Sequence, residues 1–103
     1  MGFRPNLNGT LLMAANSSSQ NIALPNGGGS LLSIENAGAN IAYCELSGDA
    51  NWPAAVPTAN VGGGFPVFAN QPPLVVRLRA GDTRVACISA GTSNVYFTRG
   101  DEV

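Results

Sequence analysis

The stretch from Leu74 to Thr98, LVVRLRAGDTRVACISAGTSNVYFT, decides the fold class. It holds three apolar runs of strand length, separated by Ala-Gly turns, at 74–79, 83–89 and 93–98. β-branched and aromatic residues fill these runs, as is typical of strands. The stretch therefore predicts three antiparallel strands joined in order as a meander.

Alternation within the runs predicts which side chains face the core. Leu74, Val76 and Leu78 share one face of the first run, so we expect them to point inward. Both faces of 83–89 are apolar, which predicts a central strand that is covered on both sides.

Similar runs lie upstream, at 20–24, 30–35, 40–46 and 65–69. A short Gly-containing link, 36–39, predicts that the second and third of these form a hairpin. About seven short strands with frequent turn signals indicate an all-β chain, folded as a single antiparallel β-sandwich of jelly-roll-like form. In 40–46 we expect Ala42, Cys44 and Leu46 to face the core.

Residues 1–19 lack a clear period and favour an extended N-terminal arm, attached to a β-sandwich domain at 20–103. A disordered terminus or a first edge strand is the alternative. The arm hypothesis assigns partner contacts to its apolar and basic side chains and expects that deleting 1–15 leaves a folded domain. These arm contacts are Phe3, Arg4, Leu7, Leu11, Leu12 and Met13.

A second candidate contact region lies in the long connection 47–64, which holds the only tryptophan, Trp52. Trp52 either packs under its loop or anchors a partner, since tryptophan is enriched at binding hot spots. Arg77, Arg79 and Arg84 form the one cluster of like charge. They are either a solvated face with local ion pairs or a patch that recognises acidic groups.

The two cysteines, Cys44 and Cys87, both fall in expected strands. They are either buried free thiols, as a reducing cytosol favours, or a disulfide between adjacent strands. With no histidine in the chain, they do not make a standard zinc site.

Charge and chemistry narrow the function. The net charge is −1 and charged residues make up 11% of the chain, which argues against binding to nucleic acid or to an anionic membrane. Without histidine or lysine, the common catalytic bases and nucleophile partners are missing. We therefore expect a protein that is not an enzyme, with no catalytic, cofactor-binding or metal-binding residues.

Several motifs resemble small β-proteins encoded among the structural genes of tailed bacteriophages. The matching segments are QNIALP at 20–25, SIENAGANIAY at 33–43, PLVVRL at 73–78, TRVACISAG at 83–91 and VYFTRGDEV at 95–103. The resemblance implies a decoration (cement) protein of the virion, made in the host cytoplasm and placed on the capsid surface. Its expected partners are the major capsid protein lattice and its own copies, as a homotrimer. The alternatives are a tail, collar or connector component, or a receptor- or carbohydrate-binding module.

Overall fold

The computed structural model describes residues 2–25 and 27–103. Met1, at the start of the expected arm, and Asn26, in the expected turn at 25–29, lie outside the described residues. The described residues form eight β-strands: β1 (Phe3–Ala15), β2 (Gln20–Ala23), β3 (Leu31–Asn36), β4 (Ala42–Ser47), β5 (Phe65–Val67), β6 (Leu74–Arg77), β7 (Arg84–Ser89) and β8 (Ser93–Glu102).

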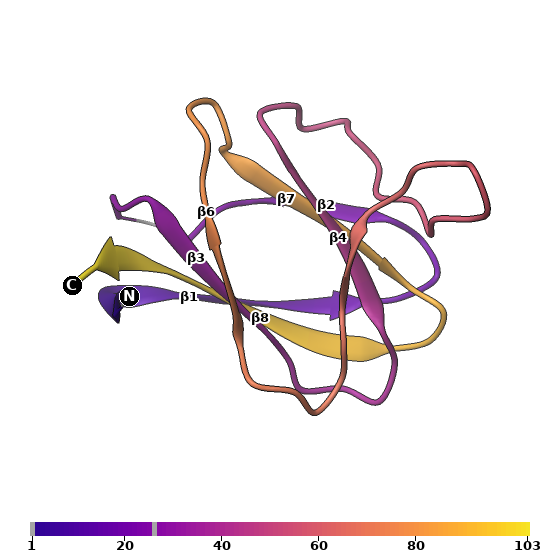
Figure 1. The fold of residues 1–103 in the computed structure, drawn as a ribbon, viewed down its shortest axis with the longest axis horizontal. Coiled ribbons are helices and arrows are strands. Elements are labelled where there is room, and N and C mark those ends of the chain that lie inside the picture. Colours follow the sequence, from indigo (N-terminus) through magenta and orange to yellow (C-terminus); the bar gives the residue numbers. More distant parts are fainter. Residues whose placement is uncertain (1, 26) are drawn as a thin grey trace.

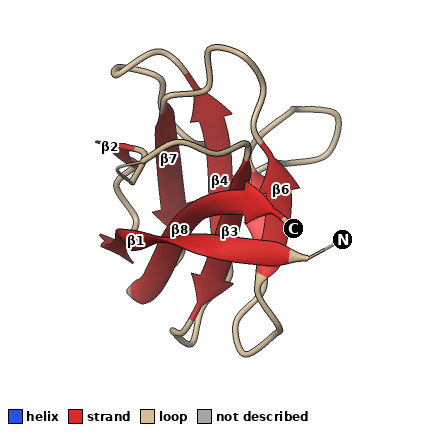
Figure 2. Cartoon of the chain, turned by 90° about the vertical axis from the view of Figure 1, so that its left-hand side faces the viewer, coloured by secondary structure: helices blue, strands red, loops and turns tan. Residues whose placement is uncertain are grey.

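The strands form two four-stranded antiparallel sheets that pack face to face (Figure 1). The first sheet has the order β1-β8-β3-β6 and the second has the order β2-β7-β4-β5. In Figure 2 every described element is a strand or a loop. The expected all-β sandwich is therefore confirmed, and no helix of the described residues is long and apolar enough to cross a membrane.

The chain passes between the two sheets at almost every connection. Of the consecutive strand pairs in the described residues, β4 and β5 alone lie in the same sheet, where they pair. The chain alternates between two sheets of four strands, and strands that are distant in sequence lie side by side. This is the arrangement of a jelly roll. The expectation of a jelly-roll-like form thus describes the observed strand order.

The expected meander and hairpin are wrong. β6 and β8 belong to the first sheet and β7 to the second, and β3 and β4 are likewise in different sheets. The physical reason is that a short turn reverses the chain without fixing the sheet to which the next strand belongs. Around Asp82, for example, Thr83 N–H bonds to the Ser47 carbonyl of the second sheet at 3.0 Å and so carries the chain across.

The seven expected runs all contain strands, with ends that differ from the prediction by a few residues. β7 is a central strand of the second sheet, as its two apolar faces predicted. Ala42 and Cys44 are buried and Leu46 packs partly against the core. Leu74, expected in the core, is instead substantially exposed, because it begins an edge strand.

The N-terminal segment is not a separate arm in this structure. β1 pairs with β8 of the same chain from Phe3 to Ala15 and forms one edge of the first sheet. Met13 and Ala15 are buried in the shared core. The alternative of a first edge strand therefore describes residues 3–15, because their inward side chains complete the sandwich.

The core lies between the two sheets and centres on Phe97, which is fully buried. Leu32, Ile34 and Val95 of the first sheet meet Val85 of the second sheet around it. Cys44 and Cys87 are also buried there and are joined by a disulfide. The structure thus has the cross-strand bond that was the alternative to two free thiols.

Candidate interaction surfaces

The first candidate surface is a bulge in the edge strand β1. Pro5 pairs with Gly100 and Thr10 pairs with Thr98, so four residues of β1 stand opposite one residue of β8. Asn8 takes a left-handed backbone conformation at φ 54°, which asparagine tolerates better than most residues. The extra residues loop out of the ladder and turn Leu7 into solvent, where its side chain is 96% exposed.

A side-chain hydrogen bond ties the bulge to a neighbouring loop. The Asn6 side-chain amide donates to the Gly28 carbonyl at 2.7 Å, which ties the bulge to the β2–β3 loop. Next to it, Arg99 Nε donates to the Gly29 carbonyl at 3.1 Å. Since Asn6 directly precedes Leu7, its bond to Gly28 limits the movement of the bulge that presents Leu7.

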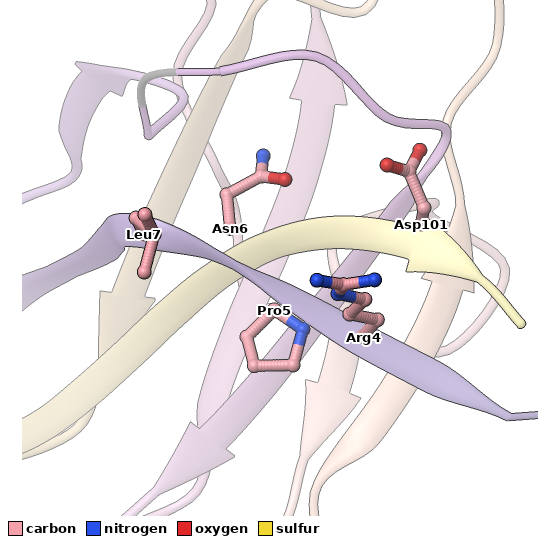
Figure 3. Close-up of a pocket in the computed structure, with 5 residues that line it drawn as sticks. All are labelled: Arg4, Pro5, Asn6, Leu7 and Asp101. Atoms are coloured by element: carbon pink, nitrogen blue, oxygen red, sulfur yellow. The ribbon is translucent and has the colours of Figure 1, made fainter.

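Beside Leu7 lies an open depression of about 630 Å³. Figure 3 shows Asn6 and Asp101 pointing to the same side of the paired strands, while Pro5 points to the opposite side. Arg4 and Asp101 are cross-strand partners in the β1–β8 ladder and bring opposite charges to its rim. We refer to Leu7 together with this depression as the bulge surface.

The second half of β1 also exposes apolar side chains. Leu12 is 53% exposed on the outer face of the first sheet, opposite Tyr96 of β8, and Leu11 is partly exposed on the inner face at the open side of the sandwich. Met13 is different, because only 2% of it is exposed. Met13 therefore belongs to the core of its own chain, and its expected place on an arm that leaves the domain is wrong.

Phe3 and Arg4 occupy intermediate positions. Phe3 is half-buried, and its ring lies against Gly100, where a Cβ atom would come within 3.0 Å of Phe3 Cε1. Arg4 is exposed at the rim of the depression. The structure thus brings Arg4 and Leu7 together on the bulge surface and uses Phe3 for packing within the chain.

Trp52 lies against the outer face of the second sheet and is 48% exposed. Its indole N–H donates to Glu45 Oε2 at 3.0 Å, and its carbonyl accepts from the Asn21 side chain at 3.0 Å. The first bond fixes the ring and the second fixes the backbone, while about half of the residue stays in water. Trp52 is therefore neither buried under its loop nor free of contacts with its own chain, and its role as an anchor for a partner stays a prediction.

The three arginines do not gather into one patch. Arg77 forms an ion pair with Glu102 at 3.0 Å in the first sheet, and Arg84 bonds to the Asn21 side chain in the second. Arg79 follows the end of β6 and contacts Asp82 at 3.2 Å. Each arginine thus has a partner in its own chain, which is the arrangement of local pairs that the sequence left open.

The Arg79–Asp82 pair perturbs both groups. Burial would raise the pKa of the Asp82 carboxyl, but hydrogen bonds from the Arg79 side chain and backbone N–H, with its positive charge, outweigh burial and lower that pKa. The same contact raises the pKa of Arg79, chiefly through its hydrogen bond to Asp82. The pair closes the β6–β7 turn.

Sequence reasoning missed Tyr96 and a second depression, of about 390 Å³, at the β5–β6 connection. Exposed Phe68 and Leu74 line that depression together with Gln71. The opposition of Tyr96 to the inward residues Val95 and Phe97 was the signal for its outward position.

Comparison of the chain with protein-family models, curated proteins and solved structures finds no match in any of the three.

Proposed function

We propose that this protein is a non-enzymatic structural subunit of a virus particle, a capsid decoration (cement) protein that binds the outside of an assembled shell. The observation that carries the proposal is Leu7, a fully exposed leucine on a bulge that a hydrogen bond from Asn6 ties to the β2–β3 loop. Burying a leucine side chain stabilises a complex by about 1.5–3 kcal/mol. An apolar side chain presented to water on such a tethered bulge is therefore suited to a protein contact.

The fold and the charge support the same function. Jelly rolls occur in viral capsid proteins and in lectins, although a fold by itself does not define function. A net charge of −1 brings little repulsion when many copies assemble side by side on one shell. The resemblance to structural proteins of tailed bacteriophages is the reason for proposing a phage as the virus particle.

The mechanism follows from mass action. A subunit that binds only the assembled shell stabilises that shell in proportion to the logarithm of its concentration over its Kd. The shell must supply an apolar hollow for Leu7 and polar partners for the Arg4 and Asp101 side chains around it. This mechanism requires only binding surfaces and no reacting group.

The test is co-sedimentation of the purified protein with shells of the source particle from which this chain has been stripped. We expect the wild-type protein to bind in hundreds of copies per shell and Leu7→Lys to bind at least tenfold more weakly, since a lysine ammonium pays for desolvation. Val61→Lys, the same kind of change at an exposed apolar residue of the β4–β5 connection, is the matched control and should bind normally. A dozen or fewer copies per particle would assign the chain to a tail, collar or connector.

The second depression favours one other candidate, a carbohydrate-binding module. Phe68 is exposed there beside Gln71, and an aromatic ring next to an amide is an arrangement that can stack on and hydrogen-bond a sugar. A glycan array answers this alternative directly. Binding that Phe68→Ala abolishes, with no binding to shells, would replace the decoration role by this one.

A further inference from the structure

The four sheet edges of the described strands differ in how well they are protected from pairing with another strand. Natural proteins protect edges with short strands, proline, charge or bulges. β2 has four residues, β5 has three and contains Pro66, and β6 has four and ends at Arg77. The first half of β1 contains Pro5 and the bulge, but Thr10–Ala15 has none of these features.

The backbone of Thr10–Ala14 presents hydrogen-bonding groups to this open edge. The Asn94 carbonyl accepts from Ala37 N–H at 2.9 Å, on the side of β8 that faces β3. Since the two backbone groups of a strand residue point to the same side, Asn94 does not bond to β1. Its partner Ala14 therefore directs its own N–H and C=O away from β8, as do Leu12 and Thr10 at two-residue spacing.

A side chain confirms this direction. The Gln20 side-chain amide reaches the Ala14 carbonyl at 2.6 Å from outside the β1–β8 ladder. It covers one acceptor at the end of the segment, and a carbonyl oxygen can accept a second bond. The groups of Leu12, at the centre of the segment, have no such cover among the described residues.

We propose that two copies of this chain join through their β1 edges, antiparallel, with Leu12 of each copy opposite Leu12 of the other on a two-fold axis. In this register Leu12 exchanges both backbone bonds with its counterpart, and Thr10 pairs with Ala14 of the second copy. A register centred on Thr10 would bring the bulge into the ladder. One centred on Ala14 would place the two Gln20 side chains together at the axis, whereas in the Leu12 register each Gln20 lies at an end of the ladder, where the Ala14 carbonyl accepts the Thr10 N–H as its second bond. The two first sheets become one continuous eight-stranded sheet.

The side chains of the segment suit a second copy of itself. On the outer face the two Leu12 side chains meet, each flanked by a Tyr96 ring. On the inner face the partly exposed Leu11 comes beside Met13 of the second copy and extends the apolar core. Thr10–Ala15 contains no charged residue, so no like charges face each other across the axis.

The dimer does not depend on the proposed attachment to a shell, since that function uses the bulge surface. It also specifies two copies, where the sequence suggested three. Native mass spectrometry and sedimentation of the purified protein alone are therefore the readouts. We expect the wild-type protein to be a dimer and Leu12→Lys to be a folded monomer, with a dimer Kd at least about 100-fold weaker from lost apolar contact and like-charge repulsion.

A charge-exchange experiment tests the register itself. Leu12→Glu alone should also be monomeric, but an equimolar mixture of Leu12→Glu and Leu12→Lys should give a heterodimer, because position 12 then faces its opposite charge. Leu7→Lys, the same change in the same strand outside the segment, is the matched control and should remain a dimer. A monomeric or trimeric wild-type protein, an intact Leu12→Lys dimer, or a mixture without heterodimer would each overturn the proposal. A dimer that ignores shells would overturn the proposed function alone.

Discussion

Cys44 and Cys87 stand directly opposite each other on β4 and β7, with their Cα atoms 4.3 Å apart, and a disulfide joins them inside the core. The bond links positions that are 43 residues apart and encloses the long connection with Trp52. Closing a loop of this length removes freedom from the unfolded chain. Both cysteines are fully buried, so a reductant reaches them only when the sandwich opens.

Reducing this disulfide should lower the free energy of unfolding by about 4 kcal/mol, as the loss of loop-closure entropy implies for a loop of this size. Urea unfolding with and without a phosphine reductant measures the difference. The double variant Cys44→Ala with Cys87→Ala is the control, because its unfolding should not respond to the reductant. A wild-type protein equally stable under both conditions would show that the bond contributes nothing.

Met13→Ala should lower the free energy of unfolding by about 2–5 kcal/mol, because it leaves a cavity between the sheets. Leu7→Ala in the same strand should change it by less than about 0.5 kcal/mol, since Leu7 contacts solvent. Thermal or urea unfolding compares the two.

Deletion of 1–15 should unfold the domain, because it removes Met13 and Ala15 from the core. This reverses the expectation for a separate arm. A truncated protein that stays folded would contradict the role of β1 in the core.

Asn36→Asp should lower the free energy of unfolding by about 3–5 kcal/mol at neutral pH. The Asn36 amide nitrogen donates to the Asn40 carbonyl at 2.7 Å and to the Val67 carbonyl at 2.9 Å, while its oxygen accepts from Ser93 Oγ at 2.7 Å. A carboxylate here would face two carbonyl oxygens in a buried site.

The matched control is Asn94→Asp on the exposed side of β8, which should change stability by less than about 0.5 kcal/mol. Chemical denaturation of both variants at pH 7 measures the contrast. Equal effects at the two positions would mean that the buried hydrogen bonds of Asn36 do not hold the β3–β4 crossing in place.

Stability should fall at acidic pH through Asp82. Its pKa in the folded state is lowered, so its contribution is fully present above the ordinary aspartate pKa of about 3.9 and is lost as the pH drops through the folded value. Asp82→Asn should cost about 1–3 kcal/mol at pH 7 and flatten the loss of stability between about pH 5 and 2. Unfolding free energies of both proteins across that range provide the measurement, and parallel profiles would exclude this origin.

The strands could be predicted because alternation is a local property. Val95 and Phe97 against Tyr96, or Ala42 and Cys44 against Tyr43, give their faces without knowledge of any partner strand. Strand pairing could not be predicted in this way, since β8 takes β1 and β3 as neighbours from the far end of the chain. Turn residues at 80–82 mark a reversal equally well for a hairpin and for a crossing between sheets.

The candidate site could be predicted only in part, because a local sequence pattern shows which side chains are apolar but not which strand they pair with. Leu7 and Leu12 were assigned to contacts because they are apolar in a segment without a clear period, and the structure exposes both. The missing period results from the bulge at 6–9, which shifts the alternation between the two halves of β1. After the bulge, Leu11, Met13 and Ala15 do alternate with Thr10, Leu12 and Ala14, and that short pattern was the signal for a strand and for a buried Met13.

The position of β8 in the first sheet also governs how the chain reaches its native state during synthesis. Thr10 and Thr98 share a hydrogen bond across 88 residues of sequence, and β8 is the one described strand that pairs with β1. On the ribosome, β1 therefore has no strand to pair with until β8 has emerged. Such distant pairing makes folding slow and leaves strand edges exposed to aggregation meanwhile. Chaperone demand and expression temperature should consequently affect the yield of this protein more than its final stability would suggest.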